Sequence, residues 1–218
     1  MRTLEGICGL NVPNELQWEL LIVDNNSTDL TRQVCEDFRS RVPLRYLYEP
    51  RQGKSYALNR ALGEATGELI VFTDDDVDAE PDWLTSYWDA ALRNPDVSVF
   101  GGKILPRWEK PPPCWVTDNQ HGLLINAHVD YGESEFVVEG SNAKVFPGGN
   151  MAFRRSVFLS GARFSEGLGP VGRNIHTPSE ETSFEHDLYT KGHKGLYVPG
   201  AVVCGTIFNV YFYKNNCR

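Results

Sequence analysis

The stretch "LIVFTDDDVDAEPDWL", residues 69–84, decides how the chain is interpreted. Five apolar or β-forming residues, Leu69 to Thr73, lead directly into three consecutive aspartates. A short apolar run of this kind is typical of a buried strand. Neighbouring carboxylates repel one another, so a folded chain that gathers three of them needs a cation or hydrogen-bond donors to offset the charge. We therefore predict a buried strand that ends on a group of functional carboxylates.

The sequence around this stretch alternates between predicted strands and helices. The predicted strands are 18–24, 43–49, 68–74 and 97–105, and the predicted helices are 30–38, 51–67 and 80–95. Because the strands are almost continuously apolar and helices separate them, the pattern indicates a doubly wound, mostly parallel α/β sheet flanked by helices.

The second half of the chain is less regular. It contains a proline-rich loop at 106–115, a region at 122–146 with a predicted helix and a smaller β excursion, and a strand followed by a helix in 147–161. A helix at 180–192 and a last strand at 196–203 follow. With 218 residues and no internal repeat, the chain is expected to form a single domain.

Composition excludes several functional classes. The net charge of −8 argues against a nucleic-acid-binding protein, because phosphate contacts need clustered Lys and Arg. Five widely spaced cysteines without a CxxC pair indicate reduced thiols and a cytoplasmic protein. Neither a signal peptide nor an apolar run of membrane-spanning length is present in the sequence.

Two of the predicted strands end on aspartate. Asp24 follows one strand, and Asp74, Asp75 and Asp76 follow another. In an open parallel sheet, ligands bind beyond the carboxyl ends of the strands, so these carboxylates are candidates for one site. Taken alone, Asp24 is better explained as a helix or turn cap. The alternative for the three consecutive aspartates is a solvated loop that caps the helix starting at Glu80, but a cap needs one carboxylate and not three. Mg²⁺ or Mn²⁺ takes one or two protein carboxylates and completes its shell with water and substrate phosphates, which favours a metal site at 74–76.

Five motifs in this order resemble the family 2 glycosyltransferases, enzymes of the GT-A fold. They are "LLIVDNNSTDLT" (20–31), "GKSYALNRAL" (53–62), "GELIVFTDDDV" (67–77), "PGGNMAFRRSVF" (147–158) and "SEETSFEHDLYTKGHKGLYVPGAVV" (179–203). The resemblance implies a nucleotide-binding half at 1–105 and an acceptor and catalytic half at 106–218.

The resemblance also implies roles for residues of the donor site. Asp24 matches the aspartate that hydrogen-bonds the nucleotide base, and Lys54 and Asn59 lie in the segment that borders the nucleotide. Asp74 and Asp76 match the DxD pair, with Asp76 facing the Mn²⁺ or Mg²⁺ ion and Asp75 beside the donor.

On the acceptor side, Gly149 and Asn150 match a turn that lines the sugar and acceptor pocket. Glu181 matches the acidic general base, with Glu180 beside it. The alternative for one of these two glutamates is an ordinary first-turn acid that favours a helix N-terminus.

The sequence departs from the family pattern at two places. The family opens with a central strand, whereas "RTLEGICGL" at 2–10 resembles the helix that follows it, so the chain is expected to be truncated at its N-terminus. The family often carries a histidine that helps bind metal after the last strand, and here Gly205 takes that position.

The expected activity is inverting, metal-dependent transfer of one sugar from a nucleoside-diphosphate sugar to a hydroxyl of a glycan or lipid-linked acceptor, in polysaccharide biosynthesis. Peripheral association with the cytoplasmic face of a membrane is a further expectation. Two alternatives are a catalytically impaired nucleotide-sugar-binding remnant and a nucleotidyltransferase, which would normally show a glycine-rich loop after its first strand.

Overall fold

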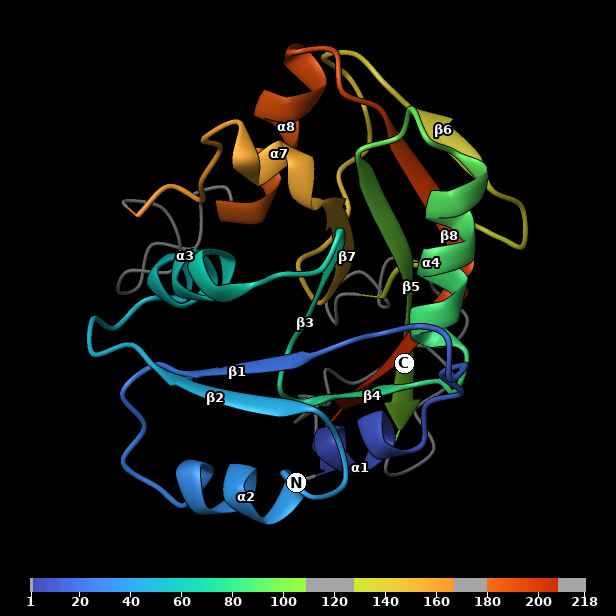
Figure 1. The fold of residues 1–218 in the computed structure, drawn as a ribbon. Coiled ribbons are helices and arrows are strands. Elements are labelled where there is room, and N and C mark those ends of the chain that lie inside the picture. Colours follow the sequence, from blue (N-terminus) through green and yellow to red (C-terminus); the bar gives the residue numbers. More distant parts are fainter. Residues whose placement is uncertain (1, 109–127, 167–179, 208–218) are drawn as a thin grey trace, which may run out of the picture.

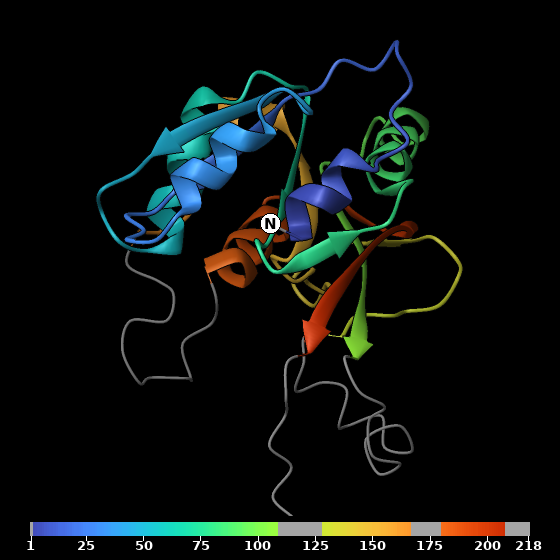
Figure 2. The same ribbon diagram turned by 90° about the horizontal axis from the view of Figure 1, so that it is seen from below.

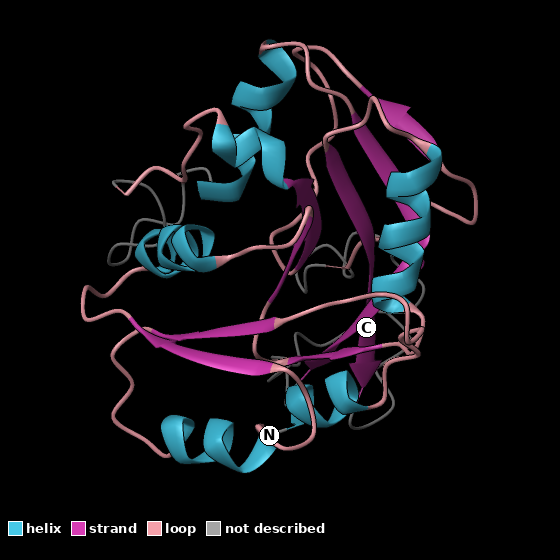
Figure 3. Ribbon diagram, in the orientation of Figure 1, coloured by secondary structure: helices cyan, strands magenta, loops and turns pink. Residues whose placement is uncertain are grey.

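The computed structural model describes residues 2–108, 128–166 and 180–207, which form an α/β fold (Figure 1). The helices are α1 (Arg2–Cys8), α2 (Thr31–Phe38), α3 (Lys54–Glu64), α4 (Trp83–Arg93), α7 (Arg155–Leu159) and α8 (Glu180–Thr190). The strands are β1 (Leu20–Asp24), β2 (Leu44–Tyr48), β3 (Leu69–Thr73), β4 (Val77–Ala79), β5 (Val99–Trp108), β6 (Phe136–Val138), β7 (Asn150–Arg154) and β8 (Gly195–Ile207). Figure 3 shows the helices arranged around the strands.

The strands form two hydrogen-bonded groups. Strands β1 and β2 pair in parallel, and a six-stranded sheet has the order β3-β7-β5-β8-β4, with β6 also paired to β8. Within the larger sheet, β5 and β8 are parallel, whereas β7 lies antiparallel between β3 and β5. Strands β3, β5 and β8 therefore share one direction. The sequence pattern predicted this common direction but not the insertion of β7, because strand order depends on contacts between distant segments.

The six-stranded sheet is covered on both faces. Alternate residues of a strand point to opposite faces, and on β7 Phe153 belongs to one core and Ala152 to another. The first core is an aromatic cluster beneath α7 and α8, where Phe153 and Phe158 pack edge to face. The second core lies against α4, whose Tyr87 is completely buried. Burial on both faces explains why the strands read as continuous apolar runs.

A third core joins α1 and α2 to β2 and includes Ile7, Phe38 and Leu44. Helix α1 also contacts β4, as Figure 2 shows from below. The predicted helix at the start of the chain is thus confirmed as α1.

The predicted helices and strands of the first half are confirmed, apart from β4, which the sequence did not indicate. It follows the three aspartates and pairs with β8 across the register Val77–Gly205. The predicted β excursion corresponds to β6, and residues 128–146, the described part of the region in which a helix was also predicted, contain no helix. Residues 122–127 of that region and 109–115 of the proline-rich loop lie outside the described residues. Helix α8 ends at Thr190, and Gly192 just beyond it adopts a φ of 87°, as expected for a glycine cap.

Candidate active site

Lys54 links two carboxylates that are far apart in the sequence. Its ammonium Nζ lies 2.9 Å from Asp74 Oδ1 and 2.7 Å from Glu181 Oε1. Lys54 begins α3, Asp74 directly follows β3 and Glu181 is in the first turn of α8. Burial alone would lower the pKa of Lys54, but the charges of Asp74 and Glu181 outweigh it and raise that pKa. The fold therefore joins a predicted donor-site carboxylate and the predicted base through one cation.

The turn that precedes β7 lies directly against both carboxylates. A Cβ atom built on Gly148 would lie 2.3 Å from Glu181 Oε1, and one built on Gly149 would lie 2.9 Å from Asp74 Oδ2. Thr73 Oγ1 donates a hydrogen bond of 3.0 Å to the carbonyl of Gly149. A side chain at 148 would therefore force the buried Glu181 side chain to shift, whereas one at 149 would meet only the end of the half-exposed Asp74 side chain.

The two remaining aspartates of the run, Asp75 and Asp76, are exposed. The Asp75 carbonyl accepts a hydrogen bond of 2.6 Å from Thr3 Oγ1. Among the described residues, the carboxylate of Asp76 makes no hydrogen bond or ion pair, so it is free to bind a ligand.

The carboxylate oxygens of Asp74 and Asp76 are ligands of the kind that hard cations prefer. The described residues contain no group of three or more His, Cys, Asp or Glu side chains that could hold a metal ion. A Mg²⁺ or Mn²⁺ ion needs only one or two protein carboxylates when phosphate oxygens and water supply the rest. Gly205, at the position of the expected histidine, pairs with Val77 beside Asp76 and has open space where a Cβ would stand.

Asp24 is buried at the carboxyl end of β1. Its Oδ1 accepts a hydrogen bond from the Ser27 amide at 2.8 Å, and its Oδ2 accepts one from the Tyr46 hydroxyl at 2.5 Å. Burial would raise the pKa of Asp24, but these hydrogen bonds lower it, so the carboxylate stays ionised. The same hydrogen bond raises the pKa of Tyr46 to about 12. Both residues line a shallow pocket together with Arg32.

A loop connects this pocket to Lys54. Asn25, which follows Asp24, accepts a hydrogen bond of 2.7 Å from the Gly53 amide and donates one to the Arg51 carbonyl at 2.6 Å. Asn25 therefore connects the carboxyl end of β1 to Gly53, the residue before Lys54.

Two of the expected site residues have structural contacts instead of open surfaces. Asn59 exchanges two hydrogen bonds with the backbone of Phe164. Asn150 is completely buried: its Nδ2 donates to the carbonyls of Lys103 and Ala201, and its Oδ1 accepts from Trp83 and Tyr87. The side chain of Asn150 thus has no hydrogen-bonding capacity left for a ligand.

The two other glutamates of α8 are also buried. Both oxygens of Glu180 lack a hydrogen-bond partner among the described residues, and burial raises its pKa. Glu185, one helical turn after Glu181, was not singled out from the sequence. Its Oε2 accepts hydrogen bonds from the Phe146 amide at 2.8 Å and the Tyr189 hydroxyl at 3.0 Å. Burial raises the pKa of Glu185 to about 8. The sequence did contain one signal for Glu185. It is an acidic residue between Phe184 and Leu188, on the apolar side of the helix.

Comparison with known proteins identifies the class. The model of glycosyl transferase family 2 matches residues 2–160, and the chain belongs to this family. The chain is 31% identical over 216 residues to the succinoglycan biosynthesis protein ExoM of Rhizobium meliloti, covering 92% of this chain and 60% of that protein. It is 27% identical over 192 residues to the glucosyl-dolichyl phosphate glucuronosyltransferase of Haloferax volcanii, covering 87% of this chain and 59% of that protein. The chain therefore spans about three-fifths of the length of these relatives.

Solved structures confirm the GT-A fold. TarS of S. aureus superimposes with a TM-score of 0.69 at 17% identity, over 94% of this chain and 34% of that chain. The mannosyltransferase PcManGT of Pyrobaculum calidifontis, solved with GDP-Man and Mn²⁺, gives a TM-score of 0.66 at 20% identity, over 96% of this chain and 53% of that chain. Within the described part of the chain, no helix has the length and apolar character needed to cross a membrane.

Proposed function

We propose that the protein transfers a single sugar from a nucleoside-diphosphate sugar to a hydroxyl of a glycan or lipid-linked acceptor, with inversion at the anomeric carbon. The observation that carries the proposal is the contact of Lys54 with both Asp74 and Glu181, because it puts a phosphate-compatible cation and a candidate base at one point. Two relatives are named as a succinoglycan biosynthesis protein and a glucosyl-dolichyl phosphate glucuronosyltransferase, which favours a role in polysaccharide biosynthesis. Peripheral association with the cytoplasmic face of a membrane is part of the same proposal.

In the proposed reaction, Glu181 accepts the proton of the acceptor hydroxyl as its oxygen bonds to the anomeric carbon. The bond from that carbon to the diphosphate oxygen breaks, and the nucleoside diphosphate leaves with the electron pair. A single displacement of this kind inverts the anomeric configuration. Lys54 remains positively charged and offsets the charge that develops on the leaving diphosphate.

We assign donor binding to Asp24, Asp74 and Asp75, and metal binding to Asp76 with Asp74. The support is that Asp24 is ionised at the end of β1 and that Asp76 is exposed without a partner among the described residues. A divalent cation bound there would neutralise the leaving diphosphate as a Lewis acid. PcManGT, which was solved with Mn²⁺, supports the choice of Mn²⁺ or Mg²⁺.

The test is calorimetric titration of UDP, GDP and dTDP with and without Mn²⁺, followed by a transfer assay with the sugar donor that binds. We expect Mn²⁺-dependent binding to the parent and its loss in Asp76→Asn, with Asp82→Asn as the exposed control. Glu181→Gln should bind the donor and lose transfer.

The alternatives predict different results. Donor binding without transfer by the parent would favour the impaired remnant. Transfer of a nucleotidyl group from a nucleoside triphosphate would favour the nucleotidyltransferase. Retained transfer in Glu181→Gln would remove the base assignment.

A further inference from the structure

Helix α8 contacts the segment before β7 at two points. Glu185 Oε2 accepts a hydrogen bond of 2.8 Å from the Phe146 amide, and Glu181 Oε1 lies where a Cβ added to Gly148 would stand. The two glutamates are one helical turn apart, which is about 6 Å along the helix axis. Phe146 and Gly148 are two residues apart, a step that spans up to about 7 Å. The spacing of the two contacts on the helix therefore matches their spacing on the segment.

The segment from Phe146 to Asn150, which we call the glycine turn, is fixed at both ends. At its far end, the Asn150 amide donates to the Pro147 carbonyl at 3.1 Å, and Asn150 is completely buried. At its start, the ring of Phe146 lies against Gly101, where an added Cβ would collide with the ring. The hydrogen bond to Glu185 holds the backbone at this end.

Tyr189 holds the carboxyl group of Glu185 in this orientation. Its hydroxyl donates to Oε2 of Glu185 at 3.0 Å, the same oxygen that accepts from the Phe146 amide. The hydroxyl itself lies against Gly195 of β8, where an added Cβ would stand 2.6 Å from its oxygen. The acceptor for the Phe146 amide is therefore fixed in place.

The position of Glu185 is unfavourable for stability. The residue lies between Phe184 and Leu188 and is completely buried. Among the described residues its Oε1 has no hydrogen-bond partner, and burial raises its pKa to about 8. A buried polar atom without a partner lowers stability, and departures of this kind are expected at functional positions.

We propose that Glu185 is a positioning residue for sugar transfer, which holds the glycine turn against Glu181 and so fixes the location of the base. The inference rests on the proposed function, in which Glu181 accepts the proton of the acceptor hydroxyl. Because Glu185 is completely buried, it contacts neither donor nor acceptor. It acts through the backbone from Phe146 to Gly148.

The test compares two substitutions of Glu185 in the transfer and titration assays. In Glu185→Met the hydrogen bonds from Phe146 and Tyr189 are lost, whereas the amide oxygen of Glu185→Gln can accept both. We expect kcat to fall by about tenfold or more in Glu185→Met, with the affinity for whichever of UDP, GDP or dTDP binds the parent changed by less than about twofold. Glu185→Gln should keep the kcat of the parent.

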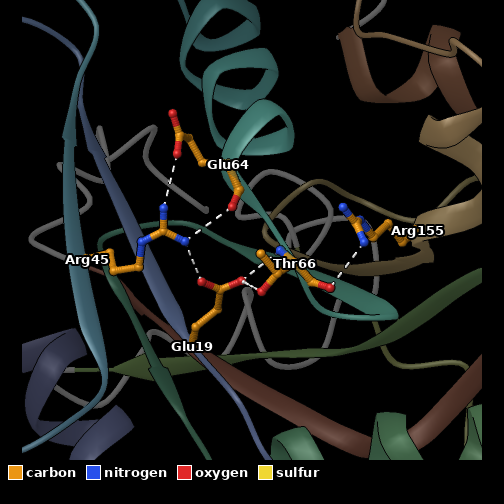
Figure 4. Close-up of polar contacts among 5 residues, drawn as sticks. All are labelled: Glu19, Arg45, Glu64, Thr66 and Arg155. Carbon is orange, nitrogen blue, oxygen red and sulfur yellow. Dashed lines mark hydrogen bonds and ion pairs between the residues drawn. The ribbon is translucent and has the colours of Figure 1, made fainter.

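Glu19 offers a matched control in a second polar network (Figure 4). Like Glu185, it accepts hydrogen bonds from a backbone amide and a hydroxyl, both from Thr66, at 2.8 and 2.7 Å. It also pairs with Arg45. This network lies at the amino end of β3, whereas Asp74 follows the carboxyl end. We expect Glu19→Met to lower stability in urea unfolding and to leave kcat unchanged.

A double variant tests whether Glu185 acts through the glycine turn. Gly148→Ala displaces Glu181 directly, so Glu185→Met should add little to the loss of kcat in the Gly148→Ala background. Losses that multiply in the double variant would overturn the proposal. So would equal losses of kcat in Glu185→Met and Glu185→Gln, or in Glu185→Met and Glu19→Met.

Hydrogen exchange tests the glycine turn without a transfer reaction. The amide of Asn150 should exchange about tenfold faster or more in Glu185→Met than in the parent, while the amide of Val99 in β5 keeps its protection. If Asn150 exchanges equally fast in both, the proposal is wrong. If Asn150 responds as expected but the parent transfers no sugar, the failure lies with the proposed function.

Tyr189→Phe provides a milder variant in case Glu185→Met does not fold. It removes one of the two donors to Glu185 Oε2 and keeps the aromatic ring. We expect a smaller fall in kcat at unchanged nucleotide affinity, together with faster exchange of the Asn150 amide. Parental values of both would overturn the proposal.

Discussion

Lys54 and Glu181 form an ion pair of 2.7 Å between the start of α3 and the first turn of α8. The carboxylate of Glu181 is buried, whereas the lysine side chain remains 42% exposed. A cation that is exposed on one side and paired with the base on the other can contact a substrate phosphate without leaving its partner. The Lys54–Glu181 pair, together with the contact of Lys54 with Asp74, fixes the relative positions of the candidate base and the donor-site carboxylate.

Replacement of Lys54 by methionine should weaken transfer more than it weakens the fold. Removal of one preorganised charge-stabilising group typically lowers kcat by roughly 10²–10³. We expect a fall in kcat of this size together with weaker donor binding, measured in the transfer and titration assays. Lys191→Met, at an exposed position of the same charge, is the control. Unchanged donor affinity in Lys54→Met would contradict contact with the diphosphate.

Gly148→Ala should disturb the base directly. The added Cβ would stand 2.3 Å from Glu181 Oε1, so the carboxylate must shift from its present position. A displacement of about 1 Å in a catalytic group can lower the rate by about 10². We expect a loss of this order in kcat with little change in donor affinity. Gly63→Ala, where a Cβ meets nothing within 4 Å, should leave kcat unchanged. Equal kcat values for the two variants would show that the turn does not control Glu181.

Glu185 should make stability depend on pH. Its pKa is about 8 in the folded protein against a usual value of 4.5, because its carboxyl group is buried. The folded state therefore binds more protons than the unfolded state between these values, and the free energy of unfolding falls as pH rises through this window.

In Glu185→Gln this dependence disappears. We expect the variant to gain stability relative to the parent by up to about 1.4 kcal/mol per pH unit between pH 4.5 and 8. Urea unfolding at several pH values measures the difference, with exposed Glu15→Gln as the control. A constant difference between variant and parent across this window would contradict the buried, protonated carboxyl group.

Asn150→Ala should lower stability, because its side chain connects β7 to α4, β5 and β8. The substitution leaves the Trp83 and Tyr87 donors and the Lys103 and Ala201 carbonyls without this partner. Each buried polar group left unpaired costs about 1–3 kcal/mol. We expect a loss of several kcal/mol in urea unfolding, against almost none for exposed Asn14→Ala. A folded Asn150→Ala variant of parental stability with a raised acceptor KM would instead favour the acceptor-pocket role.

The local elements could be predicted from the sequence because their signals are short-range. The apolar run 69–73 became β3, and the helix spacing after Gly53 became α3. The short strand β4 was missed because three residues after an aspartate run carry little periodic signal, and its formation depends on pairing with β8.

The site was predicted only in part. Asp74, Glu181 and Lys54 were selected separately, and the fold brings them into contact. The backbone contacts of Asn59 and Asn150 could not be predicted from the sequence, because an amide that binds backbone groups and one that binds a sugar look alike there. Glu185 was missed because its burial depends on packing against the segment before β7.

The sequence by itself determined the alternation of strands and helices, the carboxylates at the strand ends and the family, since these depend on local patterning and motif order. Only the tertiary structure decided that Lys54 joins Asp74 to Glu181 and that β7 lies between β3 and β5. The physical reason is that these contacts join segments that are distant in the sequence. They depend on three-dimensional packing and strand pairing, and a local sequence pattern carries no information about either.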